Sequence, residues 1–233
     1  MVLQAQEGQL TTSAVRVLVA TAVPAERDAV AQALDLPGID VIAVGVGPAQ
    51  AAAATATALT RAALEGAPYG LAVSAGIAGG FAPHAPVGAL VVADEITVAD
   101  LGAQTPDGFL PVTELGFGTV THRPPEALVR EVATATGARP GAILTVSTVT
   151  GTAVRAAELR ERHPTALAEA MEGFGVAEAA AAHRTPVLEL RAVSNPVGPR
   201  DRAAWRIGEA LAALTEAFGK LAPVLEGWHP HDR

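Results

Sequence analysis

Three polar positions stand out in an otherwise apolar chain because their side chains, two carboxylates and an amide, could move a proton or bind a polar ligand. Glu26 follows an apolar run that ends at Val23, Glu172 lies in the segment MEGFG, and Asn195 ends the run LRAVSN. A carboxylate can act as a general base and can stabilise positive charge that develops in a reaction. These residues could form one site if the fold brings them together.

Each of the three also has an ordinary structural explanation. Glu26 follows Pro24, so it can simply place a negative charge in the first turn of a helix. Glu172 could lie on the solvent face of a helix, and Asn195 precedes a proline, as is common in turns. A binding site is favoured because Glu26, the AGIAGG loop and Ser194-Asn195 fall at predicted carboxyl ends of strands or in the helix beside them.

Alternating apolar strands and helices are expected to position these residues. The predicted strands are 15–23, 40–46, 69–77, 89–98, 142–149 and 187–193, and the predicted helices are 49–64, 127–136, 153–163, 166–184 and 201–221, with a further helix starting at Pro24. This alternation predicts an α/β fold, a single-domain three-layer α/β/α arrangement around a mostly parallel mixed sheet. We expect a flexible N-terminal tail at 1–14, the domain at 15–225 and a C-terminal tail at 226–233.

Two segments are expected to form loops near the site. The glycines of SAGIAGG would let a ligand approach the backbone, which makes Ile77, Ala78 and Gly79 candidate contacts. Residues 101–125 are rich in proline and glycine and could cover the site. The turn GVGPAQ at 45–50 lacks the third glycine of a dinucleotide fingerprint, so it indicates a structural turn.

Composition narrows the class of ligand. The formal charge of −8 disfavours nucleic acid and anionic membranes as partners, and no apolar run approaches the length of a membrane span. The chain has no cysteine, and its six histidines show no metal-binding pattern, so neither a metal nor a cofactor is expected. These features, with no evident signal peptide, predict a cytoplasmic protein that acts on a small molecule.

Five motifs in order resemble the nucleoside phosphorylase superfamily, in its hydrolase branch of the methylthioadenosine nucleosidase type. They are ATAVPAE, SAGIAGG, PVGALVVADE, EAMEGFGVAEAA and LRAVSN, and the resemblance covers nearly the whole chain after residue 15. It implies that Glu26 activates the attacking water and that Met171 and Glu172 grip the ribose. It also implies that Arg191 pairs with Glu26 and keeps it ionised, while a buried structural pair is the other explanation.

The end of the last strand suggests which purine is released. The adenine-specific nucleosidases end this strand in Ser-Asp, whereas this chain has Ser194-Asn195. An amide cannot deliver a proton to the leaving base, but it can hydrogen-bond O6 or N7 of hypoxanthine. Together with SNPVGPRDRAAW, this resembles the futalosine hydrolases, which implies cleavage of futalosine to hypoxanthine and dehypoxanthine futalosine in menaquinone biosynthesis.

The attacking group is expected to be water, because the glycine segment lacks the arginine with which phosphorylases of the superfamily bind phosphate. The segment VSTVTGT lacks the aromatic that the nucleosidases place near the base, which leaves Phe174 or Phe81 to stack there and the Thr152 backbone to contact the purine edge. Arg200 and Arg202 are either cations for the benzoate of futalosine or ordinary surface residues.

Three other functions stay open at this point. The chain could be an adenosine-analogue nucleosidase, an inosine-type phosphorylase, or a purine nucleoside binding protein without activity. Retention of both Glu26 and Glu172 argues against a mere binder. The resemblance also implies a homo-oligomer, whose size no residue decides.

Overall fold

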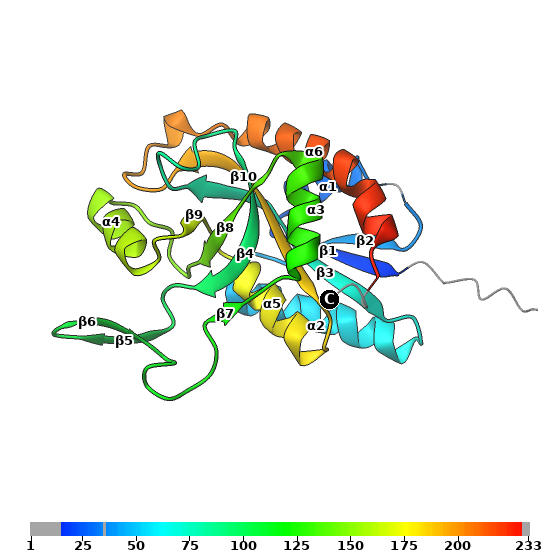
Figure 1. Cartoon of the computed structure of the whole chain (residues 1–233), viewed down its shortest axis with the longest axis horizontal. Coiled ribbons are helices and arrows are strands. Elements are labelled where there is room, and N and C mark those ends of the chain that lie inside the picture. The colour runs from blue at the N-terminus through cyan, green and yellow to red at the C-terminus, as the bar shows by residue number, and fades with distance from the viewer. Residues whose placement is uncertain (1–14, 35, 230–233) are drawn as a thin grey trace, which may run out of the picture.

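The computed structural model of the chain describes residues 15–34 and 36–229, so the tail expected at 1–14 lies outside the described residues. An eight-stranded sheet carries helices on both faces, and a small hairpin projects from one end (Figure 1). The sheet contains β1 (Arg16–Thr21), β2 (Ile39–Ala43), β3 (Tyr69–Gly80), β4 (Leu90–Val98), β7 (Thr121–His122), β8 (Arg139–Thr145), β9 (Ala166–Ala170) and β10 (Val187–Pro196). The hairpin is β5 (Gly102–Thr105) and β6 (Gly108–Pro111), and the helices are α1 (Pro24–Ala31), α2 (Pro48–Leu64), α3 (Glu126–Thr136), α4 (Ala153–Arg162), α5 (Gly173–Ala182) and α6 (Ile207–Gly227), with a 3-10 turn at Arg202–Ala204.

The long strand β3 is the centre of the sheet. It pairs in parallel with β1 and β10 and antiparallel with β9 at its carboxyl end. From β10 the sheet continues through β4 and β8 to β9, which returns to β3, so that five strands close into a ring. Most pairings are parallel, which confirms the mixed, mostly parallel sheet expected from the sequence.

Helices cover the two faces of the sheet and complete the predicted α/β/α layers. On one face α6 packs against α1 and α3, and Val17 and Val19 of β1 share an apolar cluster with Leu214 and Phe218 of α6. On the other face α2 packs along α5, whose Ala177 is buried in a second cluster. No helix of the described residues is long and apolar enough to cross a membrane.

The helix predicted for 166–184 is wrong in its first part. Residues 166–170 form β9, which pairs in parallel with β8 and antiparallel with β3, and all five residues are buried. Sheet pairing overrides the helical preference of the alanines here, because helix propensity is a weak prior. The helix α5 begins only at Gly173, so Glu172 lies at its N-cap position.

Three other segments depart from expectation. SAGIAGG is not a loop, since β3 continues to Gly80. The segment 101–125 contains the β5–β6 hairpin and the short strand β7. The helix predicted for 201–221 begins at Ile207 and runs to Gly227, and the buried Trp228 packs in the core beyond the domain end expected at 225.

Candidate active site

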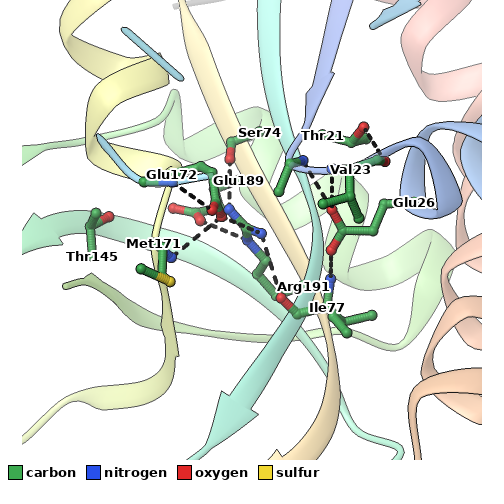
Figure 2. Close-up of polar contacts among 12 residues, drawn as sticks. Thr21, Val23, Glu26, Ser74, Ile77, Thr145, Met171, Glu172, Glu189 and Arg191 are labelled. Atoms are coloured by element: carbon green, nitrogen blue, oxygen red, sulfur yellow. Dashed lines mark hydrogen bonds and ion pairs between the residues drawn. The ribbon is translucent and has the colours of Figure 1, made fainter. Parts of the chain in front are cut away.

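Glu26 lies at the carboxyl end of β1, as the sequence predicts, and points toward β3. Pro24 opens α1, which places Glu26 in the first turn, where its side chain is 4% exposed. One carboxylate oxygen accepts the backbone N–H groups of Ala22 and Val23, at 2.9 and 3.3 Å, and the other accepts that of Ile77 at 2.8 Å (Figure 2). The backbone thus holds this acid against the glycine-rich end of β3.

Glu172 lies where β9 turns into α5 and is 5% exposed. Its Oε1 accepts the N–H of Gly47 at 3.2 Å, and its Oε2 accepts that of Met171 at 3.3 Å. The turn at 45–50, which the sequence gave no ligand role, therefore holds this carboxylate. Met171 and Glu172 are adjacent, and Arg191 lies between them and Glu26 (Figure 2).

The two glycines that follow Glu172 are explained by close packing. A Cβ on Gly173 would overlap the carboxylate of Glu189, and a Cβ on Gly175 would overlap the carbonyl of Pro48. Gly173 therefore makes room for a buried acid, and Gly175 lets α5 approach the start of α2.

Arg191 lies between the two acids, but its partners differ from the expected one. Its Nε donates to Glu189 at 2.9 Å, its Nη2 donates to Ser74 at 3.0 Å, and its Nη1 lies 3.4 Å from Glu172 Oε2. Among the described residues its ion pairs are with Glu189 and Glu172, so the expected pairing with Glu26 is corrected. Three backbone N–H groups hold the Glu26 carboxylate, whereas Glu189 is hydrogen-bonded to Arg191 alone among the described residues.

Glu26 and Arg191 nevertheless approach the same bare backbone. A Cβ on Gly76 would lie 2.5 Å from Glu26 Oε1 and 2.7 Å from Arg191 Nη1. Gly76 is also the register partner of Arg191 in the pairing of β3 with β10. Glu26 and Arg191 are thus brought together at Gly76, and Arg191 also contacts Glu172.

Burial controls the charges of this network. Desolvation raises the pKa of Glu189 to about 6, although Arg191 opposes the rise. Burial also disfavours the charge on Arg191, but Glu189 and Glu172 outweigh it and raise its pKa, so the guanidinium stays charged. A permanent cation therefore lies beside Glu172 in a nearly dry environment.

Asn195 lies near the end of β10 and lines a small pocket. Its Oδ1 accepts the Ser194 hydroxyl at 2.9 Å, and its Nδ2 donates to the Pro196 carbonyl at 3.1 Å. The pocket is also lined by Gly79, Val149, Thr150, Glu169, Val197, Gly198, Pro199, Arg200 and Trp205. In the sheet register Asn195 pairs with Gly79, which lies three residues beyond Gly76, the residue approached by Glu26.

Glu169 was missed by the sequence analysis. It is 6% exposed, its Oε1 accepts the Thr150 N–H at 2.8 Å, and its Oε2 accepts the Thr150 hydroxyl. Burial raises its pKa, and the two hydrogen bonds from Thr150 partly oppose this. The available signal was an acid within the apolar run ALAEAM, which the wrong helix assignment hid.

The remaining predicted residues are less closely grouped. Ala78 is buried in β3 beside Gly79, but Thr152 is exposed and caps α4 by accepting the N–H of Arg155 at 3.2 Å. Phe174 is buried with its ring 5.3 Å from that of His122. Neither Thr152 nor Phe174 lines the Asn195 pocket.

Of the other residues suggested by the sequence, one lies in the core, one lines the pocket and one lies near Trp205. Phe81 is 1% exposed in a core cluster, whereas Arg200 lines the pocket and lies 5.3 Å from the centre of the Trp205 ring. Arg202 lies 5.9 Å from the same ring. Among residues 15–34 and 36–229, no three His, Asp or Glu side chains gather as a metal site requires.

Comparison with known proteins gives consistent results. The model of the phosphorylase superfamily matches residues 25–226. The chain is 73% identical over 232 residues to a futalosine hydrolase of Streptomyces coelicolor, covering 93% of this chain and 99% of that one, and 46% identical over 226 residues to one of Acidothermus cellulolyticus, covering 89% and 90%. Among solved structures, a methylthioadenosine/S-adenosylhomocysteine nucleosidase of Colwellia psychrerythraea in complex with adenine aligns with a TM-score of 0.79 at 21% identity, covering 93% and 98%.

Proposed function

Since this chain belongs to the phosphorylase superfamily, we propose that it hydrolyses the N-glycosidic bond of futalosine and releases hypoxanthine and dehypoxanthine futalosine. The observation that carries the proposal is the 73% identity to a futalosine hydrolase over 93% of the chain. This reaction would be a step of menaquinone biosynthesis, as the sequence resemblance implies. The arrangement of Glu26, Glu172 and Asn195 along β3 supports the same chemistry.

In the proposed mechanism Glu26 is the general base. As the bond between C1′ and N9 lengthens, positive charge develops on the sugar and negative charge on the purine. A water molecule bonds to C1′ as the C1′–N9 bond breaks, and it gives a proton to Glu26. The purine takes up a proton from solvent to leave as hypoxanthine, and Glu26 then releases its proton to solvent. The three backbone N–H groups fix the position of the Glu26 carboxylate beside β3, where it can accept that proton.

Glu172 and Met171 are proposed to bind the ribose. The Glu172 carboxylate would accept hydrogen bonds from the 2′ and 3′ hydroxyls, and its negative charge would favour a sugar that becomes positive in the transition state. Because Arg191 contacts Glu172 and Glu189 instead of Glu26, its proposed role is to position Glu172. The hydrogen bonds from Gly47 and Met171 have the same effect.

Water is the proposed nucleophile. The strand β3 donates the Ile77 N–H to Glu26 and carries no arginine or lysine to bind phosphate. The Glu26 carboxylate itself would repel a phosphate anion at the β1–α1 turn.

The proposal is tested by chromatography of the purified protein with futalosine, inosine and methylthioadenosine, each with and without phosphate. Hypoxanthine released from futalosine at a rate independent of phosphate is the expected result. Adenine release would indicate an adenosine-analogue nucleosidase, phosphate dependence would indicate a phosphorylase, and binding without release would indicate a nucleoside-binding protein. Each of these three results would refute the proposal.

The proposal includes a homo-oligomer, as the resemblance implies. Two apolar side chains support it, since Leu64 at the end of α2 is 84% exposed and Phe117 is 69% exposed. Light scattering of the purified protein would test it, and a monomeric mass at micromolar concentration would contradict it.

A further inference from the structure

Glu189 is a buried acid with no role in the proposed hydrolysis, although it lies against residues of the site. It is completely buried in β10, and its Oε1 accepts the Arg191 Nε–H at 2.9 Å (Figure 2). Within the described part of the chain its Oε2 has no hydrogen-bond partner. Apolar side chains in place of a buried ion pair are often neutral or stabilising, so stability does not explain this acid.

The sheet brings Glu189 and Arg191 together on one face. Residues two apart in a strand point to the same side, and in the register of β3 with β10 Glu189 pairs with Ser74 and Arg191 with Gly76. A Cβ on Gly76 would lie 2.7 Å from Arg191 Nη1, so the bare backbone makes room for the guanidinium. The Ser74 hydroxyl accepts from Nη2 at 3.0 Å. Glu189 and Ser74 therefore hold two of the three nitrogens.

These two contacts determine where the third nitrogen points. The guanidinium is planar, and its five N–H groups have fixed directions. With Nε on Glu189 and Nη2 on Ser74, Nη1 lies 3.4 Å from Glu172 Oε2. Because Glu172 is the carboxylate proposed to bind the ribose, Glu189 is separated from the sugar by Arg191 and Glu172 alone.

The start of α5 confines Glu189 on its other side. A Cβ on Gly173 would overlap the Glu189 carboxylate, so the two groups are in close contact. The next N–H along the chain, that of Phe174, donates to the Thr145 hydroxyl at 2.8 Å and anchors this end of the helix to β8. Glu189 therefore cannot move away from Arg191 without displacing the residue next to Glu172.

We propose that Glu189 is a positioning residue of the hydrolytic site, whose carboxylate orients the Arg191 guanidinium and thereby holds Glu172 where it can bind the ribose hydroxyls. This inference rests on the proposed function, because that function assigns the ribose to Glu172. The bond from Nε joins two charged groups only while Glu189 is ionised, and ionisation of a partner strengthens a hydrogen bond. Glu172 should therefore be held most firmly when Glu189 is charged.

Glu189 changes its charge within an accessible pH range. Burial raises its pKa to about 6, while Arg191 lowers the pKa and Glu172 raises it. Its register partner on β3, Ser74, carries no charge. Glu189 is thus mostly protonated at pH 5 and mostly ionised at pH 8. Since a protonated carboxyl group resembles an amide in shape and charge, Glu189→Gln imitates the low-pH state.

The test measures kcat for base release from futalosine between pH 5 and pH 8, in the intact protein and in Glu189→Gln. The amide oxygen can still accept from Nε, so the variant keeps the contact but loses the charge. The ratio of the two rates should be about 1 at pH 5 and rise to about 3–10 at pH 8, with a midpoint near pH 6. Because both proteins share Glu26, its titration cancels in this ratio. Glu131→Gln, at an exposed position on α3, should give a ratio near 1 at every pH.

A second measurement needs no activity. Isothermal titration compares the binding of inosine and 2′-deoxyinosine at pH 8. The 2′ hydroxyl should strengthen binding to the intact protein by about 10-fold or more, because it donates to Glu172. Glu189→Gln should reduce this preference by at least about threefold. In the intact protein the preference should fall by a similar factor between pH 8 and pH 5.

A merely structural role for Glu189 predicts different results. If it only filled space in the core, Glu189→Gln would change the rate by one constant factor at every pH and leave the nucleoside preference unchanged; either result would overturn the inference. A preference of the intact protein that stays constant from pH 8 to pH 5 would also overturn it, whether or not the variant folds. If the intact protein released no base from futalosine, the proposed function would fail, while the nucleoside preference would still decide whether Glu189 acts through Glu172.

Discussion

For the substitution Gly173→Ala, helix propensity and the packing of the site predict opposite changes in stability. Gly173 is the first residue of α5, and helix propensity alone predicts that alanine there stabilises the protein by up to about 1 kcal/mol. The structure predicts the opposite sign. The new Cβ would lie closer than 3.0 Å to both oxygens of Glu189, which is completely buried and bonded to Arg191.

The magnitude follows from what must move. Glu189 has no open space to enter, so the methyl group either displaces the carboxylate from Arg191 or shifts the start of α5. Overpacking of this kind costs about 1–3 kcal/mol. A shift of about 1 Å in the neighbouring Glu172 could reduce the rate of base release by about 100-fold.

Urea unfolding and base-release kinetics measure the two effects. Gly219→Ala is the matched control, because Gly219 is an exposed residue inside α6 and its Cβ would meet nothing within 4 Å. The control should be stabilised by about 1 kcal/mol with unchanged activity. If Gly173→Ala is also stabilised and remains fully active, the packing argument for the MEGFG segment is refuted.

Three further predictions concern single side chains. Glu26→Gln should abolish base release, by at least 100-fold, while nucleoside still binds, since the amide cannot take the proton from water; undiminished turnover would remove Glu26 from the mechanism. Asn195→Asp should slow futalosine turnover and begin to admit adenine nucleosides, and an unchanged purine preference in competition assays would contradict this. Burial raises the pKa of Glu189 from 4.5 to about 6, so between these pH values the folded state binds more protons than the unfolded state. As the pH rises through this range, Glu189 should therefore lower the free energy of unfolding by up to about 2 kcal/mol. Urea unfolding between pH 4.5 and 6.5 should then show a flatter pH dependence for Glu189→Gln than for the intact protein, and parallel curves would contradict the assignment.

The sequence was sufficient for features that depend on local pattern. Apolar runs that end in polar residues located β1, β3 and β10, and Pro24 correctly placed Glu26 in the first turn of α1. It was insufficient where a residue's environment is set by distant segments. The alanine-rich sequence of β9 predicts a helix, but pairing with β8 and β3 makes it a strand. The helix assignment would put Glu169 on a helix face, whereas in the structure Glu169 lines a pocket.

The partner of Arg191 shows the same limit at the level of a single contact. A sequence shows that a buried arginine needs acids, but Glu26, Glu172 and Glu189 all satisfy that requirement. Backbone geometry decides among them, because two N–H groups of the β1–α1 turn and one of β3 bond to Glu26, while Glu172 and Glu189 form the ion pairs with the guanidinium.

The glycines of β3 connect these observations. An isolated glycine weakens a strand, so two of them at Gly76 and Gly79 in the most central strand of the sheet require a compensating benefit. At Gly76 a side chain would collide with Glu26 and Arg191, and at Gly79 it would collide with Val197 and approach the Asn195 amide. Larger residues there would add strand stability but would displace the groups that we propose to act on the sugar and on the base. The two glycines that weaken β3, Gly76 and Gly79, are therefore the positions that make room for the side chains of the site.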